Sequence, residues 1–200
     1  MKTTMKTTIV LLSIFLLTVV SGYAQQKRYP YVQDGKIIVC REGNDGVIST
    51  LIHPNWTTTP SHDETDAANN RFAAKFEVAA ASAVGNNGKT WPMSWFEATG
   101  TLREGWNPNG YSACAQYSEA ANQSDKGSWR LPTARELRLI HALLNELTSV
   151  NMPSERHWST TESSSKDNIA MTVAFGDNDG EIYGGPKTSD AYYTRCVRDI

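Results

Sequence analysis

The sequence predicts an α+β domain, and two patterns in its second half carry that prediction. An amphipathic helix with a capped start follows Thr133, and an alternating apolar strand runs over Ile169–Phe175. Helices and strands occupy separate blocks of the chain, and an irregular aromatic stretch precedes them. This order is typical of α+β architecture, in which helices pack against a mainly antiparallel sheet.

The first 24 residues have the order of a secretory signal peptide. Lys2 and Lys6 precede an apolar stretch of 12 residues, Ile9–Val20, and small residues lead up to Ala24. The alternative is a membrane anchor, but a spanning helix needs about 20 apolar residues. We therefore expect cleavage after Ala24, export to the periplasm, cell surface or extracellular space, and no membrane span in the mature chain.

The mature chain is predicted to be acidic. Removing residues 1–24 from the 200 leaves 176 residues with 17 Lys and Arg against 21 Asp and Glu, a net charge of −4. Nucleic-acid-binding domains present a basic face. The charge therefore argues against a nucleic-acid partner and against a polybasic contact with a membrane.

Upstream of Trp91 the sequence predicts short strands and one long loop. Lys36–Arg41 is apolar enough for a strand, and Val47–Ile52 is its expected partner across a Gly- and Asn-containing turn. His53–Asn70 is polar and contains two prolines, which indicates a surface loop. Arg71–Ala81 favours another strand. Gln25–Tyr31 is polar and is expected to be irregular.

The next stretch begins with aromatic, turn-rich sequence and then predicts a first helix. Trp91–Gly110 has no clear helical or strand period. Ser112–Asn122 places Cys114, Tyr117 and Ala121 at positions i, i+3 and i+7, which is the spacing of one helical face. We expect that face to point into the core.

The clearest helix begins after Thr133. Thr133 has the character of an N-cap, and Glu136 three positions later completes a capping box. A deeply buried face follows with helical spacing, formed by Leu137, Ile140, Leu144 and Leu147 and widened by Leu139 and Leu143. Asn151 and Pro153 are expected to end this helix.

Strands are expected after the second helix. Ile169–Phe175 alternates apolar with small or polar residues, the pattern of a half-buried strand. The turn Gly176–Gly180 brings the chain back through Glu181–Tyr183, and Ala191–Arg198 forms the last strand. The expected domain thus has two helices and a small, mainly antiparallel sheet.

Three cysteines remain in the mature chain, namely Cys40, Cys114 and Cys196. In an oxidising compartment one disulfide is expected, with one cysteine left over. The residues themselves leave all three pairings open.

Three motifs in the C-terminal half carry a family resemblance. They are Trp129–Leu137 (WRLPTAREL), His157–Glu162 (HWSTTE) and Arg195–Ile200 (RCVRDI). Over Trp91–Ile200 the chain resembles the C-type lectin-like domain at the C-terminus of Legionella collagen-like adhesins and of fimbrial tip proteins of Bacteroides-type bacteria. The resemblance implies a lectin-like domain at residues 91–200, preceded by an N-terminal extension at residues 25–90.

The resemblance also implies a disulfide and a ligand-binding region. Lectin-like folds bond a cysteine of the first helix to one of the last strand, which here means Cys114 and Cys196, and Cys40 then stays a buried thiol. Ligands of such folds meet the loops between the second helix and the last strand, here Glu155–Asp190. The candidate ligand-binding residues there are Asp167, Asn168, Asp177, Asn178, Asp179, Glu181 and Tyr183, with Lys187 as a further polar side chain.

Metal and catalytic chemistry find little support in the sequence. Asp177–Glu181 resembles a calcium loop, but its glycine is fourth rather than sixth, so a hairpin turn is favoured. His53 and His62 stand near acidic residues without the spacing of a zinc site. The sequence contains no nucleophile elbow, phosphate loop or paired-carboxylate motif. We expect no cofactor, no metal and no enzymatic activity.

Aromatic side chains are the remaining candidates for a binding role. Sugar sites use exposed aromatic faces beside a few polar groups, and one or two tryptophans at most are expected to be exposed. The candidates by residue type are Trp91, Trp95, Trp106, Tyr111 and Tyr183. The sequence thus predicts an exported, non-enzymatic adhesin that recognises an extracellular glycan or surface protein. The alternative is a structural subunit of a pilus or surface assembly that binds other subunits and no glycan.

Overall fold

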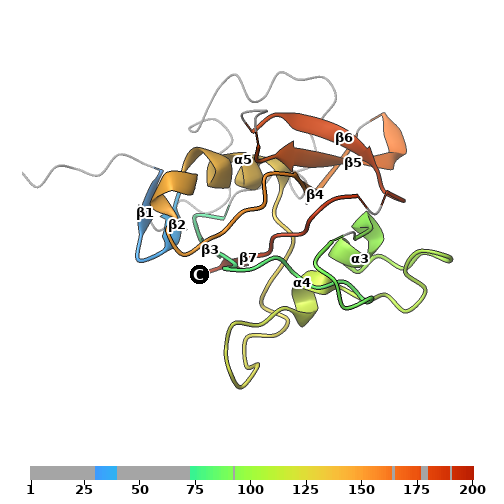
Figure 1. Cartoon of the computed structure of the whole chain (residues 1–200), viewed down its shortest axis with the longest axis horizontal. Coiled ribbons are helices and arrows are strands. Elements are labelled where there is room, and N and C mark those ends of the chain that lie inside the picture. Colours follow the sequence, from blue (N-terminus) through green and yellow to red (C-terminus); the bar gives the residue numbers. More distant parts are fainter. Residues whose placement is uncertain (1–29, 40–72, 92, 164, 177–179, 190) are drawn as a thin grey trace, which may run out of the picture.

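The predicted α+β class is confirmed by the structure, a computed structural model that describes residues 30–39, 73–91, 93–163, 165–176, 180–189 and 191–200. Within these residues, three short α-helices and one 3₁₀ helix accompany two antiparallel sheets (Figure 1). The elements are β1 (Tyr31–Gln33), β2 (Lys36–Ile38), β3 (Lys75–Val78), α3 (Trp95–Thr99), α4 (Ala113–Gln116), α5 (Ala134–Ala142), η3 (Leu144–Glu146), β4 (Arg156–Ser163), β5 (Lys166–Ala174), β6 (Ile182–Pro186) and β7 (Val197–Asp199).

The first sheet has the strand order β1-β2-β3-β7. The sequence predicted β2 and β3 but missed β1, which forms a hairpin with β2 through Asp34 and Gly35. Both turn residues have positive φ, 52° and 73°. An Asp-Gly pair favours such a two-residue hairpin turn, so the signal for β1 was present in the sequence.

Strand β3 joins the upstream segment to the end of the chain. It pairs with β7 in the register Phe76↔Asp199 and Val78↔Val197. Ile37 of β2 and Phe76 of β3 are fully buried in the same core as helix α5. The described strands before residue 91 therefore help to build the core of the C-terminal half.

The second sheet, in the order β4-β5-β6, separates two apolar cores. The prediction of a half-buried β5 was wrong, because this central strand is buried on both faces from Ala170 to Ala174. Met171 and Val173 point into the core shared with α5, whereas Ala170 belongs to the core around α3 and α4. Cover on both faces explains why the small alternating residues are buried too.

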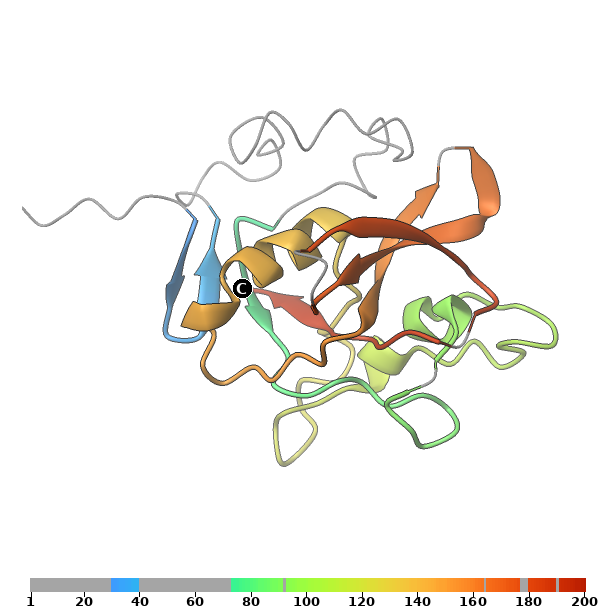
Figure 2. The same cartoon turned by 45° about the horizontal axis from the view of Figure 1, so that its top comes forward.

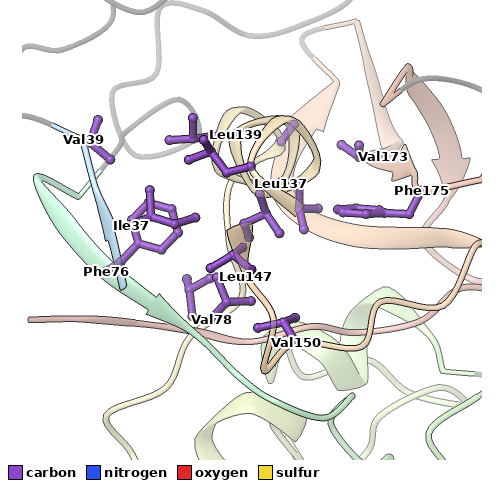
Figure 3. Packing of buried hydrophobic residues seen from close by; sticks show 14 of the residues in the cluster. Ile37, Val39, Phe76, Val78, Leu137, Leu139, Leu147, Val150, Val173 and Phe175 are labelled. Carbon is purple, nitrogen blue, oxygen red and sulfur yellow. The ribbon is translucent and has the colours of Figure 1, made fainter. Parts of the chain in front are cut away.

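Helix α5 confirms the predicted start at Thr133. The Thr133 side chain accepts from the Glu136 N–H and the Glu136 carboxylate accepts from the Thr133 N–H, which completes the capping box. Its apolar face packs between β2, β3 and β5 (Figure 3), where Leu137 and Leu139 of this helix are labelled.

The end of α5 differs from the prediction. The α-helix ends at Ala142 rather than at Asn151, and η3 continues the chain through one 3₁₀ turn. Leu144 is half-buried against the core, and Leu147 beyond the turn is buried. The apolar spacing therefore persists although the helix does not.

The predicted helix over Ser112–Asn122 is reduced to the single turn α4. Ser112 caps it, and Tyr117 already has extended backbone. The chain then folds around the Asp125 carboxylate, which accepts hydrogen bonds from the Ser118 hydroxyl and from the N–H groups of Glu119 and Ala120. These bonds satisfy backbone donors outside a helix, so Tyr117 is only half-buried and Ala121 is exposed.

Helix α3 was missed in the aromatic stretch. Its start is a capping box in which Ser94 accepts from the Glu97 N–H and the Glu97 carboxylate accepts from the Ser94 N–H. Gly100 ends it with φ of 85°. The Ser-x-x-Glu signal was readable, but a five-residue helix offers too little length for a helical period.

The segment before β7 links the two sheets. Tyr193 exchanges backbone hydrogen bonds with β4, donating to the Arg156 carbonyl and accepting from the Trp158 N–H. On its other side, the carbonyls of Thr194 and Cys196 accept from the N–H groups of Ala83 and Ala79. The predicted strand over 191–198 is thus an extended segment that ends in the shorter strand β7.

Several predictions fall outside the described residues. These are the signal peptide, Cys40, the strand over residues 47–52, the polar loop over 53–70, and the candidate residues Asp177, Asn178 and Asp179. Within the described part of the chain, no helix is long and apolar enough to cross a membrane.

Stability should depend on pH through the buried His157. Burial, together with the nearby positive Arg195, lowers the pKa of His157 to about 3. The unfolded chain takes up a proton near pH 6.5 that the folded chain accepts only near pH 3, so stability should fall as the pH drops through this window.

Urea unfolding of the wild type and of His157→Gln between about pH 7.5 and 4.5 measures this effect. In His157→Gln the slope of the unfolding free energy against pH should be smaller than in the wild type by up to about 1.4 kcal/mol per pH unit. The control variant His141→Gln replaces a half-buried histidine, and it should keep most of the dependence of stability on pH. An unchanged slope in His157→Gln would contradict the assignment.

Candidate functional site

A disulfide closes the half of the domain that contains α3 and α4. Cys114 on α4 bonds to Cys196, with a Cα–Cα distance of 5.5 Å and 82 residues of sequence separation. This confirms the pairing that the resemblance implied. Both cysteines are buried in the core around α3 and α4, together with Trp95, Trp129 and Trp158. The disulfide therefore fixes the buried core from which the loops of this half extend.

Three of the described tryptophans belong to the core around the disulfide. Trp95, Trp129 and Trp158 are buried. The Trp95 indole N–H donates to the Ser159 carbonyl at 2.9 Å, and that of Trp158 donates to the Met93 carbonyl at 2.8 Å. Because their polar atoms are already bonded inside, these side chains hold the fold together and leave no face for a ligand.

The other two described tryptophans are exposed, as expected for one or two at most. Trp91 is 46% exposed and Trp106 is 44% exposed. They lie on different loops, Trp91 before α3 and Trp106 between α3 and α4. Both views of the fold place α3 and α4 at the side of the molecule away from β1 and β2 (Figure 2).

Trp91 is held rigidly although it is exposed. Its indole N–H donates to the Ala191 carbonyl at 3.1 Å. Its ring stacks on that of Tyr193, with centroids 6.2 Å apart and planes 23° from parallel. Tyr193 in turn lies 5.7 Å from the buried His157 ring. The indole is therefore fixed against the core while nearly half of its surface faces solvent.

The loop that carries Trp106 is organised by the buried side chain of Asn107. Its amide nitrogen donates to the carbonyls of Phe96 and Tyr111 at 2.8 and 2.9 Å and lies 3.1 Å from that of Thr101. Its amide oxygen accepts from the Tyr111 N–H. One asparagine thus joins both ends of the loop between α3 and α4.

Lys187, predicted as a surface polar group, is buried. Its ammonium pairs with the Glu162 carboxylate and lies 4.5 Å from the centre of the Trp95 ring. This arrangement ties the chain after β6 to β4 and α3. Lys187 therefore stabilises the scaffold and is not presented to a ligand.

The other predicted ligand-binding residues that the structure describes fall into two groups. Asp167 and Asn168 are exposed at the start of β5, where the Lys187 N–H donates to the Asn168 carbonyl. Glu181 and Tyr183 lie at the opposite end of the β5–β6 pair, where Tyr183 is opposite Thr172. With a rise of roughly 3.3 Å per residue, the four positions from Asn168 to Thr172 already separate the two groups by about 13 Å along the strand.

Glu181 and Tyr183 form a small surface group of their own. The Tyr183 hydroxyl donates to the Glu181 carboxylate, which raises the pKa of Tyr183. The guanidinium of Arg156 lies 3.9 Å from the centre of the Tyr183 ring. These contacts use the polar atoms and one ring face of the group internally.

No group of three or more potential metal ligands occurs among the residues that the structure describes. The calcium-like turn at 177–179 lies outside them. Sequence reasoning selected Trp91 by residue type but missed Tyr193, its partner, and Asn107, the loop anchor. No sequence pattern indicated either residue, because their roles depend on contacts that form only in the folded protein.

The fold and its surface define a disulfide-closed α+β domain that presents fixed aromatic side chains on loops. The chain belongs to the Lcl C-terminal domain family, whose model matches residues 87–198. This is the family that the three sequence motifs indicated through Legionella collagen-like adhesins. None of the curated proteins compared with the chain matches it.

Replacing Asn107 should loosen the loop that carries Trp106. Asn107→Ala removes the side-chain partner of the Tyr111 N–H and of the Thr101 and Tyr111 carbonyls, whereas the Phe96 carbonyl still accepts from the Gly100 N–H. The loss should lower the free energy of unfolding by about 1–3 kcal/mol. Asn107→Asp retains the acceptor for the Tyr111 N–H but places a carboxylate beside carbonyls, so it should also destabilise the fold.

Urea unfolding measures the stability of both variants, and tryptic cleavage after the exposed Arg103 measures the opening of the loop. Ser118→Ala, outside this loop, should leave the rate of that cleavage unchanged. Wild-type stability and cleavage in Asn107→Ala would contradict the role of Asn107 as the loop anchor.

Proposed function

We propose that this protein is an exported, non-enzymatic adhesin that recognises an extracellular glycan or surface protein. The signal-like sequence at residues 1–24 supports export, and so does the disulfide, since such bonds persist in oxidising compartments. Membership of the Lcl C-terminal domain family supports a role at the cell surface. We also propose that residues 91–200 have the C-type lectin-like fold that the sequence motifs implied.

The observation that carries the proposal is the fixed, exposed indole of Trp91. A binding surface gains affinity when its aromatic groups are already ordered, because little side-chain entropy is then lost on binding. Trp91 meets this condition through Ala191 and Tyr193. Exposure without such fixation would favour a chance surface residue instead.

One observation favours the alternative of a pilus or surface-assembly subunit. Leu102 is 68% exposed and shares the loop of Trp106. An apolar pair on a loop braced by Asn107 is suited to a protein surface rather than to a sugar. The two functions therefore use different loops, which allows them to be separated.

The mature protein should bind a defined glycan on an array, and Leu102→Ala/Trp106→Ala should bind it as the wild type does. If the protein is instead an assembly subunit, the wild type should bind no glycan, and the same double variant should no longer co-purify with pilus subunits from the cell surface. Wild-type protein that binds neither glycans nor surface proteins would contradict both functions. Turnover of a substrate that one side-chain substitution abolishes would contradict the non-enzymatic assignment.

A further inference from the structure

We propose that Trp91, backed by Tyr193, is a stacking platform for the apolar face of an uncharged hexopyranose. The inference rests on the proposed binding function and adds to it the class of ligand and the residue that contacts it. It follows from the rigidity of the indole, the polar groups beside it and the charge of the domain.

The rigidity comes from two contacts that leave nearly half of the indole exposed. The hydrogen bond to the Ala191 carbonyl fixes the indole edge, and the nearly parallel, offset ring of Tyr193 packs against it. The exposed 46% of Trp91 is therefore presented in one orientation. A flat ring held in this way suits a flat, weakly polar partner, because both can meet without rearrangement.

Polar groups accompany the ring on the turn that precedes it. Asn86, Asn87 and Thr90 are exposed there. The turn is braced by the Gly85 N–H donating to the Lys89 carbonyl at 2.8 Å and by the Asn86 N–H donating to the Glu97 carboxylate. These residues precede Trp91 by one to five positions, and the Asn87 side chain already accepts from the Lys89 N–H. Amide and hydroxyl groups near an apolar ring are the combination that orients a sugar by its hydroxyls.

The charge of the domain argues against an anionic ligand. Residues 91–200 carry ten Lys and Arg against fourteen Asp and Glu, a net charge of −4. Arg130, Lys187 and Arg198 are paired with carboxylates, and Arg195 is buried. A sulfated or uronic-acid polymer would approach a domain of its own sign, which is unfavourable, although Lys89 is exposed on the turn before Trp91.

The chemistry of the indole face selects the partner. The face of an aromatic ring is electron-rich and attracts C–H groups that carry partial positive charge. A hexopyranose such as β-galactose gathers several C–H bonds on one side of its ring and its hydroxyls on the rim. That side can lie on Trp91 while rim hydroxyls reach the turn at residues 85–90.

Saturation-transfer NMR with methyl β-D-galactopyranoside and methyl β-D-glucopyranoside tests the platform on the mature, oxidised protein. The protons on one side of the sugar ring should receive the strongest transfer. Trp91→Ala should reduce binding at least about tenfold, and Trp91→Phe, which keeps a ring, should recover part of it. Trp106→Ala, which removes an equally exposed indole from another loop, should bind as the wild type does.

Salt and folding controls separate the outcomes. Affinity should change little between about 0.05 and 0.5 M salt, because no ion pair forms with the sugar. If Trp91→Ala does not fold, the Trp91→Phe affinity and the proton-specific transfer in the wild type decide. Binding only of sulfated or uronic-acid glycans, or sugar binding that persists in folded Trp91→Ala, would overturn this inference alone. Wild-type protein that binds no glycan and no protein would overturn the proposed function as well.

Discussion

The Cys114–Cys196 disulfide is the constraint on which the irregular half of the domain depends. Among the described residues, the helices of this half are the short α3 and α4, and long loops connect them. Closing 82 residues of chain separation removes unfolded-state entropy worth about 4.5 kcal/mol in the chain-entropy model. The bond also holds α4 against the segment that carries Tyr193. The disulfide and Tyr193, which packs against Trp91, therefore lie on the same segment of the chain.

A buried carboxylate fixes the other half of the domain. Glu136 has no exposed side-chain surface, yet it caps α5, accepts from the Ala73 N–H and pairs with Arg130 at 2.7 Å. Arg130 also bonds to Asp199 of β7. Breaking such a buried pair by removing one partner is costly, because the remaining charge is left without compensation. Glu136 and Arg130 together thus join the start of α5, the strand β7 and the chain before β3.

Sequence reasoning succeeded where the signal is local and failed where tertiary contacts decide. The cap at Thr133 and the strand at β5 were predicted, because capping and apolar alternation are properties of neighbouring residues. Cover by two cores made β5 buried on both faces, and this cannot be read from its own alternation. The helix predicted to continue after α4 does not form, because Asp125 accepts hydrogen bonds from the backbone N–H groups six and five residues before it. Trp91 was a candidate by type, but its selection required Tyr193, 102 residues later in the chain.

Peptide mapping of non-reduced protein recovered from outside the cytoplasm tests the central claim most directly. That claim is that an exported chain is closed by one disulfide, which fixes the loops of the binding surface. Digestion and mass analysis should find the Cys114 peptide linked to the Cys196 peptide, with Cys40 as a free thiol. A dominant bridge to Cys40, or three free thiols in the exported protein, would contradict the account.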